Sequence, residues 1–128
     1  MTTKRIMVVE DDVIIASLIE NRLKKIGYAV SGIFDSGEDA IAGAEEHRPD
    51  LVLMDIRLRG EIDGIYAASE ITSRLDIPCV FLTSYSDRDT IERAKATKPK
   101  GFILKPFTDD ALRSTIEIAF SRREETPF

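Results

Sequence analysis

Hydrophobic residues in this chain follow two alternating patterns, short continuous runs and helix-like spacings. Five runs have the length and composition of buried strands, at residues 6–9, 28–34, 51–54, 79–82 and 101–104. Continuous apolar runs are typical of parallel strands that are covered on both faces. After each run, apolar residues recur every three or four positions, as on one face of a helix. Five strands alternating with five helices predict an α/β fold.

Several residues mark where the predicted helices begin or end. Gly27 is placed to end the first helix, and Ser36, Ser86 and Thr108 are placed to cap the second, fourth and fifth. The fourth helix has few apolar residues, which is typical of a weakly anchored element. The side chains predicted to face the core are Ile15, Leu18, Ile19, Leu23 and Ile26, then Ala40, Ile41 and Ala44, then Ile65, Ala68, Ile71 and Leu75, then Ile91, Ala94 and Ala96, and finally Leu112, Ile116, Ala119 and Phe120.

The alternation of strands and helices also predicts a topology. Right-handed crossovers leave few arrangements, and the flavodoxin-like strand order 2-1-3-4-5 is favoured. In that order the first and third strands are neighbours, at the point where the chain connections reverse direction. The glycine-interrupted run at 28–34 is expected at an edge. We predict one doubly wound domain over residues 1–128, with its core in residues 4–121 and a charged tail at 122–128.

The composition is that of an ordinary globular domain, with 43% hydrophobic and 32% charged residues. A formal net charge of −5 argues against direct nucleic-acid binding. No apolar run approaches the ~18 residues of a membrane span, and the N-terminus lacks a signal-peptide core, so we expect a cytoplasmic protein without a membrane partner. The single cysteine, Cys79, provides no disulfide framework and is expected to be a buried structural thiol.

Candidate chemistry lies at the carboxyl ends of four predicted strands. Parallel strands end at the same edge of a sheet, so these side chains are expected to share one shallow pocket. Several carboxylates there would repel unless a cation lay between them, and oxygen ligands suit Mg²⁺. A carboxylate nucleophile, a divalent cation, a lysine and a hydroxyl are the groups needed to transfer a phosphoryl group to aspartate. The residues concerned are Glu10, Asp11 and Asp12, Asp55, Thr83 and Ser84, and Lys105 and Pro106.

Each of these features taken alone has a simpler interpretation. An acid after a strand commonly forms a turn or caps the next helix, and an isolated lysine is usually a solvated charge. The combination is more informative, because polar groups that fit one reaction follow four strands of one predicted sheet. We therefore favour a functional site, organised around Asp55.

Residues 8–12, 51–55, 81–84 and 101–107 resemble the receiver domain of two-component response regulators, and the resemblance extends from residue 4 to about residue 121. It implies that Asp55 is the phospho-acceptor and that Mg²⁺ (or Mn²⁺) is the cofactor. The roles that it implies are metal ligation by Glu10, Asp11, Asp55 and the main-chain carbonyl of Arg57, a helix cap at Asp12, the site lysine at Lys105, switch positions at Thr83 and Phe102, and a cis bond before Pro106.

The resemblance also implies a mechanism and partners. A histidine kinase or phosphotransfer protein would donate the phosphoryl group, and Thr83 and Phe102 would then rearrange. The surface made by the fourth helix, fifth strand and fifth helix would change shape, and two copies could pair through it. The cognate kinase and the downstream target are not readable from the chain, nor is whether the domain stands alone.

Three features depart from the usual pattern of the family. The segment after the expected acceptor, residues 56–64, is one residue longer than usual and lacks the common Met-Pro. Arg57 and Tyr85 are bulky residues flanking the acceptor site, and we hypothesise that they lengthen the lifetime of the aspartyl phosphate by restricting water. The alternative is that both side chains point to solvent. The aromatic switch residue is Phe102, which has no hydroxyl.

Two rival functions are compatible with parts of this pattern. A pseudo-receiver would bind partners without phosphorylation, although every acceptor-site position is filled in this chain. A phosphohydrolase of the haloacid dehalogenase type also uses an aspartate nucleophile after a strand, but it needs a second aspartate two residues on, where this chain has Arg57. We expect a signalling domain and not an enzyme, except for its own phosphorylation and dephosphorylation.

Overall fold

The computed structural model describes residues 3–84 and 88–124, with side chains up to residue 121. Five parallel strands form one sheet in the order β2-β1-β3-β4-β5, which confirms the predicted topology. The glycine-interrupted strand β2 lies at an edge, also as predicted. The elements in chain order are β1 (Arg5–Val9), α1 (Val13–Ile26), β2 (Ala29–Phe34), α2 (Gly37–His47), β3 (Leu51–Asp55), α3 (Gly64–Leu75), β4 (Cys79–Thr83), α4 (Arg88–Lys95), β5 (Gly101–Leu104) and α5 (Asp109–Glu124).

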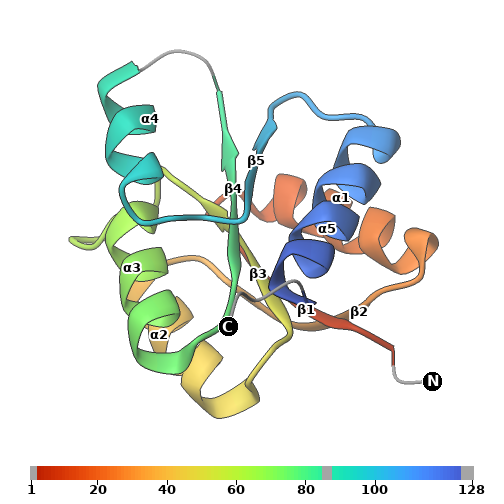
Figure 1. Ribbon diagram of the computed structural model, residues 1–128, viewed down its shortest axis with the longest axis horizontal. Coiled ribbons are helices and arrows are strands. Elements are labelled where there is room, and N and C mark those ends of the chain that lie inside the picture. The colour runs from red at the N-terminus through yellow and green to blue at the C-terminus, as the bar shows by residue number, and fades with distance from the viewer. Residues whose placement is uncertain (1–2, 85–87, 125–128) are drawn as a thin grey trace.

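The sheet lies between two layers of helices (Figure 1), with α2, α3 and α4 on one face and α1 and α5 on the other. Successive strand residues point to opposite faces. Both faces are covered, and this explains why the strands are continuously apolar. Met7, Val9, Val52, Met54 and Phe81 belong to the core on the α2–α3 side, and Ile6, Val8, Leu51, Leu53, Val80 and Leu82 to the core on the α1–α5 side.

The observed helix ends follow from the capping residues in the sequence. The side chain of Asp12 accepts hydrogen bonds from the first N–H groups of α1, and Ser36 caps α2 in the same way. The hydroxyl of Thr108 accepts from the backbone N–H of Ala111 at 3.0 Å. Gly27 ends α1 with a φ of 118°, a conformation that suits glycine. The predicted cap Ser86 lies outside the described residues.

Two predicted core residues are wrong. Ala96 is exposed, because α4 ends at Lys95 and Ala96 lies just beyond it. Leu18 is 45% exposed, because the buried face of α1 is formed by Ala16, Ile19 and Leu23. The short side chain of Ala16 faces the sheet, and this orientation leaves Leu18 on the flank of the helix. The other predicted inward residues are buried or half-buried, namely Ile15, Ile19, Leu23, Ile26, Ala40, Ile41, Ala44, Ile65, Ala68, Ile71, Leu75, Ile91, Ala94, Leu112, Ile116, Ala119 and Phe120.

The segment between β3 and α3 is fixed at both ends. Ser36, before α2, forms a β-bridge with Arg59, and the N–H of Gly64 donates to the carbonyl of Ile56 at 2.9 Å. Asp63 caps α3 and also receives a hydrogen bond from Arg93 of α4 at 3.1 Å. The segment between β3 and α3 therefore contacts both α2 and α4.

The last helix extends beyond the predicted core of the domain. Helix α5 continues to Glu124, three residues into the segment predicted to be a charged tail. Across residues 3–84 and 88–124, no helix has the length and apolar character required to cross a bilayer.

Candidate functional site

The polar residues from four strand ends meet in one pocket at the carboxyl edge of the sheet. Its cavity measures about 350 Å³. The strand order brings β1, β3, β4 and β5 side by side, so residues distant in sequence become neighbours. The residues that line it are Glu10, Asp11, Asp12, Ile15, Asp55, Ile56, Arg57, Leu82, Thr83, Ser84, Thr90 and Lys105.

Asp55 is the last residue of β3, and only 7% of it is exposed. Its Oδ1 accepts a hydrogen bond from the backbone N–H of Arg57 at 3.2 Å, and its Oδ2 accepts one from Lys105 Nζ at 3.1 Å. The carboxylate is therefore held in one orientation at the floor of the pocket. Gly64 packs against the main chain of Asp55, and a Cβ there would lie 1.9 Å from the carbonyl oxygen of Asp55. Only glycine permits α3 to begin this close to β3.

Glu10 and Asp11 complete an acidic cluster with Asp55. One carboxylate oxygen from each lies within 4.8 Å of the other two. Glu10 is almost fully buried, and its Oε2 accepts from the backbone N–H of Asp12 at 3.1 Å. Asp12 directs its own side chain to the start of α1, as predicted. Three converging carboxylates form an all-oxygen set of the kind that binds Mg²⁺, so the residues present fit this ion.

Lys105 provides the positive charge of the pocket. Its Nζ lies 2.9 Å from Glu10 Oε1 and 3.1 Å from Asp55 Oδ2. Burial alone would lower the pKa of Lys105, but the hydrogen bond to Glu10 and the charge of Asp55 outweigh burial and raise that pKa. Burial, together with the neighbouring charge of Asp55, also raises the pKa of Glu10, against the opposing effect of Lys105. The lysine is therefore a permanent cation at neutral pH, held between two carboxylates.

The two predicted switch residues lie on neighbouring strands. Thr83 ends β4, is buried, and donates its hydroxyl to the carbonyl of Ser84 at 3.0 Å. Phe102 of β5 is half-buried, with its ring centroid 5.7 Å from that of Phe81. The backbone N–H of Lys105 donates to the carbonyl of Thr83 at 2.8 Å, and the Lys105–Pro106 bond is cis.

Sequence reasoning missed two residues that shape the pocket. Thr90 reaches it from α4, although nothing in the sequence distinguishes this threonine from a surface residue. Gly64 opens α3, and its contact with Asp55 becomes visible only when β3 and α3 are placed together. Of the two proposed modulators, Arg57 is exposed at the pocket rim, and Tyr85 lies outside the described residues.

The fold and the site define a family. The sequence pattern of the response regulator receiver domain matches residues 6–117, so the chain belongs to this family. Receiver domains are signalling modules of two-component systems and not classical enzymes.

Individual relatives agree with this assignment. PdtaR, a transcriptional regulatory protein of Mycobacterium tuberculosis, is 39% identical over 122 residues, which are 95% of this chain but 59% of PdtaR. Among solved structures, the signal receiver domain of a modulated diguanylate cyclase from Desulfovibrio desulfuricans is similar, with a TM-score of 0.91, 36% identity, and coverage of 96% of this chain and 98% of that one. The N-terminal domain of a three-domain response regulator from Carboxydothermus hydrogenoformans has a TM-score of 0.86 and 34% identity, covering 95% and 98% of the two chains.

Proposed function

We propose that this receiver domain accepts a phosphoryl group on Asp55 from a phosphohistidine partner. The observation that carries the proposal is the position of Lys105 Nζ, which lies between Asp55 Oδ2 and Glu10 Oε1 in a pocket that Thr83 also lines. A carboxylate nucleophile, a fixed cation and a hydroxyl donor are thus assembled in one cavity. These groups can align and stabilise a phosphoryl group in transfer.

The transfer step follows from these positions. A carboxylate oxygen of Asp55 attacks the phosphorus of phosphohistidine in line with the bond to the imidazole nitrogen. The new bond joins oxygen to phosphorus, and the imidazole leaves with the electron pair of the broken P–N bond and takes up a proton. Lys105, whose pKa is raised by its acidic neighbours, stays protonated and offsets charge on the phosphoryl oxygens.

A divalent cation is part of the proposal. Glu10, Asp11, Asp55 and the main-chain carbonyl of Arg57 would hold Mg²⁺ or Mn²⁺, which supplies charge neutralisation and orientation for the phosphoryl oxygens. The clustering of three carboxylates within 4.8 Å supports this assignment. Without a cation, three acids would compete for one lysine, so the pocket has more negative charge than Lys105 can balance.

Phosphorylation would act on Thr83 and Phe102. An aspartyl phosphate adds a charge approaching about −2 and three acceptor oxygens. The hydroxyl of Thr83, which now donates to Ser84, would donate to one of these oxygens instead. Phe102 would then move farther inward, and the α4–β5–α5 surface would shift toward its active arrangement.

Exposed apolar residues that follow the acidic residues directly in the chain support a protein donor. Val13 and Ile14, in the first turn of α1, are 81% and 80% exposed. Apolar side chains beside a charged cavity would gain from burial against a docked helical partner. The donor is proposed to be a histidine kinase or phosphotransfer protein. The predicted absence of nucleic-acid binding and the predicted cytoplasmic location remain predictions.

A homodimer through α4, β5 and α5 is a secondary part of the proposal. Leu104 of β5 and Ile118 of α5 are exposed apolar side chains on these elements. Their burial in a dimer would be favourable, and phosphorylation is expected to favour pairing. Sedimentation of the protein with and without acetyl phosphate tests this part.

Intact-mass measurement with acetyl phosphate and Mg²⁺ tests the proposed function. We expect one phosphoryl group to be added, with none in Asp55→Asn and very little in Asp11→Asn. Asp12→Asn is the matched control, because Asp12 lines the same pocket but caps α1, and asparagine is an equally good cap. Absence of any mass increase in the parent would favour the pseudo-receiver alternative. Continuous turnover of phosphate esters would favour the phosphohydrolase.

A further inference from the structure

Two non-covalent contacts join α1 to the segment that follows β5, outside the pocket that holds Asp55. It is centred on Arg22, in the second half of α1. The Arg22 guanidinium forms an ion pair with Asp109, the first residue of α5, and lies 5.9 Å from the ring centroid of Phe107. Arg22, Phe107 and Asp109 are all half-buried, so these contacts are partly shielded from water.

We propose that Arg22 is a positioning residue that sets the place of Lys105 in the pocket. This inference rests on the proposed phosphoryl transfer to Asp55. Lys105 lies only two residues before Phe107, and its own N–H is fixed by the carbonyl of Thr83 at 2.8 Å. The segment 105–109 is thus held at its start by β4 and at its end by Arg22 of α1.

Arg22 joins the two elements that position the contact between Lys105 and Glu10, namely helix α1 and the segment 105–109. Helix α1 follows directly on Glu10, Asp11 and Asp12, so its position is coupled to the acidic side of the pocket. The segment 105–109 carries the lysine. A change in the spacing between α1 and this segment would alter the 2.9 Å contact between Lys105 and Glu10.

The environment of Arg22 favours this role over that of a solvated surface charge. Phe107 packs against the α1–α5 core, so the arginine covers an aromatic ring that is itself anchored. The planar guanidinium suits contact with a ring on one face and a carboxylate at its edge, which lysine cannot reproduce. Arg22 Nε is buried and has no hydrogen-bond partner among the described residues, so the contacts to Phe107 and Asp109 determine its orientation.

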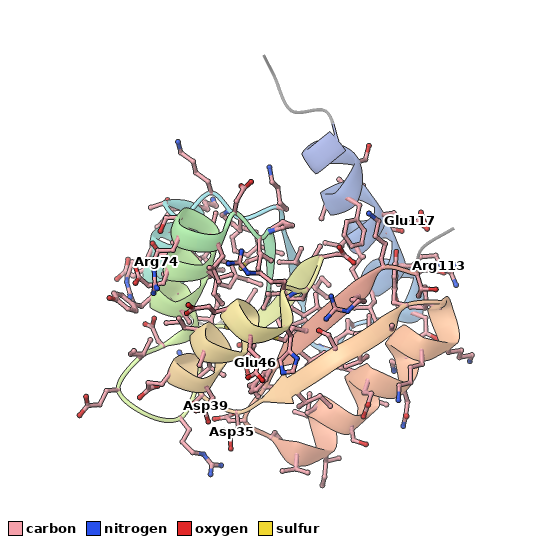
Figure 2. All side chains as sticks on the ribbon, turned by 90° about the horizontal axis from the view of Figure 1, so that it is seen from below. Asp35, Asp39, Glu46, Arg74, Arg113 and Glu117 are labelled. Atoms are coloured by element: carbon pink, nitrogen blue, oxygen red, sulfur yellow. The ribbon has the colours of Figure 1, made fainter. Side chains whose placement is uncertain are left out.

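Loss of the Arg22 contacts is expected to slow phosphoryl transfer moderately. A half-exposed ion pair and one cation–π contact together correspond to a loss of about three- to ten-fold in the transfer rate if the segment 105–109 is released. Arg113→Gln is the matched control. Arg113 of α5, labelled in Figure 2, forms an ion pair with Asp110 close to the same end of the helix and touches no residue of segment 105–109 in the contacts described.

A double-mutant cycle with Lys105 decides whether Arg22 acts through the lysine. Rates of Asp55 phosphorylation by acetyl phosphate and Mg²⁺ are measured for the parent, Arg22→Gln, Arg113→Gln, Lys105→Ala and Arg22→Gln combined with Lys105→Ala. Arg22→Gln is expected to be slower than the parent, Arg113→Gln unchanged, and the double variant no slower than Lys105→Ala. A parent rate in Arg22→Gln, or an equal slowing with and without the lysine, would overturn the inference.

An NMR measurement separates failure of this inference from failure of the proposed function. The side-chain ε-methylene signal of Lys105, assigned with Lys105→Arg, reports its position between Glu10 and Asp55 without any phosphorylation. Arg22→Gln is expected to move this signal toward the position of exposed lysines, and Arg113→Gln is not. A parent that accepts no phosphoryl group would refute the proposed function, while an unmoved Lys105 signal would refute the role of Arg22.

Discussion

The contact between Gly64 and Asp55 allows a direct test of how the fold positions the proposed phospho-acceptor. Gly64 is the first residue of α3, and its N–H donates to the carbonyl of Ile56 at 2.9 Å. A Cβ on Gly64 would lie 1.9 Å from the Asp55 carbonyl oxygen, whereas ordinary contacts begin near 3.4 Å. Gly64→Ala must therefore separate α3 from the end of β3 by roughly 1.5 Å, because the position of a Cβ is fixed by its own backbone and the oxygen that it meets is also part of the backbone.

Gly64→Ala should lower both the free energy of unfolding and the rate of phosphoryl transfer. The free energy of unfolding should fall by about 2 kcal/mol, since about 1 for the weakened hydrogen bond and about 1–3 for overpacking exceed the gain of up to about 1 from replacing glycine. The rate of phosphoryl transfer should fall by about 100-fold, because a displacement of about 1 Å misaligns the attacking carboxylate. Urea unfolding and intact-mass kinetics with acetyl phosphate measure the two effects.

Gly27→Ala is the control that separates stability from positioning. Gly27 has a φ of 118°, and no atom lies within 4 Å of a Cβ built there. Alanine would strain the backbone by about 1–2 kcal/mol without any contact to the pocket. We expect Gly27→Ala to lose stability and keep the parent transfer rate. Phosphorylation of Gly64→Ala at the parent rate would refute the claim that the start of α3 positions Asp55.

Three further predictions concern the charge of Lys105, the lifetime of the aspartyl phosphate and the thiol of Cys79. Lys105→Ala leaves Glu10 and Asp55 buried without their cation, so the free energy of unfolding without metal at neutral pH should fall by about 3 kcal/mol. Urea titrations should show that this loss of stability becomes smaller as the pH falls through the raised pKa of Glu10, because the protonated carboxyl no longer needs a cation. Arg57→Asn should shorten the aspartyl-phosphate lifetime, and an unchanged decay rate would contradict shielding by this side chain. Burial raises the pKa of Cys79 to about 12, so between pH 9 and 12 the parent should lose about 1.4 kcal/mol per pH unit relative to Cys79→Ala.

The order and direction of the strands were predictable because the three central strands are buried on both faces. The runs at β1, β3 and β4 are continuous, and all their hydrophobic residues are buried. Helix faces were less predictable. Leu18 and Ile19 both fit a helical spacing, but the choice between them depends on how closely Ala16 approaches the sheet. That distance is set by the tertiary packing and cannot be read from a periodic pattern.

The site was predictable to the extent that it is built from strand ends. Asp55, Thr83 and Lys105 each follow a strand directly, so the topology alone brings them to one edge. Gly64 and Arg22 were not predictable, because each acts through a contact between elements whose separation is unknown from sequence. Thr90 reaches the pocket from α4, a helix with no motif to indicate which side faces the site.

Helix α4 is weakly anchored, and it is connected to the site through the segment between β3 and α3. This helix buries only Ala94, and Arg93 ties it to Asp63 by an ion pair whose partners are 60% and 36% exposed. Such a pair contributes less than about 1 kcal/mol. Asp63 also caps α3 and ends the segment that begins at Asp55, so a movement of that segment would act on α3 and α4 together. Since few contacts oppose a shift of α4, one or two new hydrogen bonds to an aspartyl phosphate, at about 1.5–3 kcal/mol each, would be sufficient to change its preferred position.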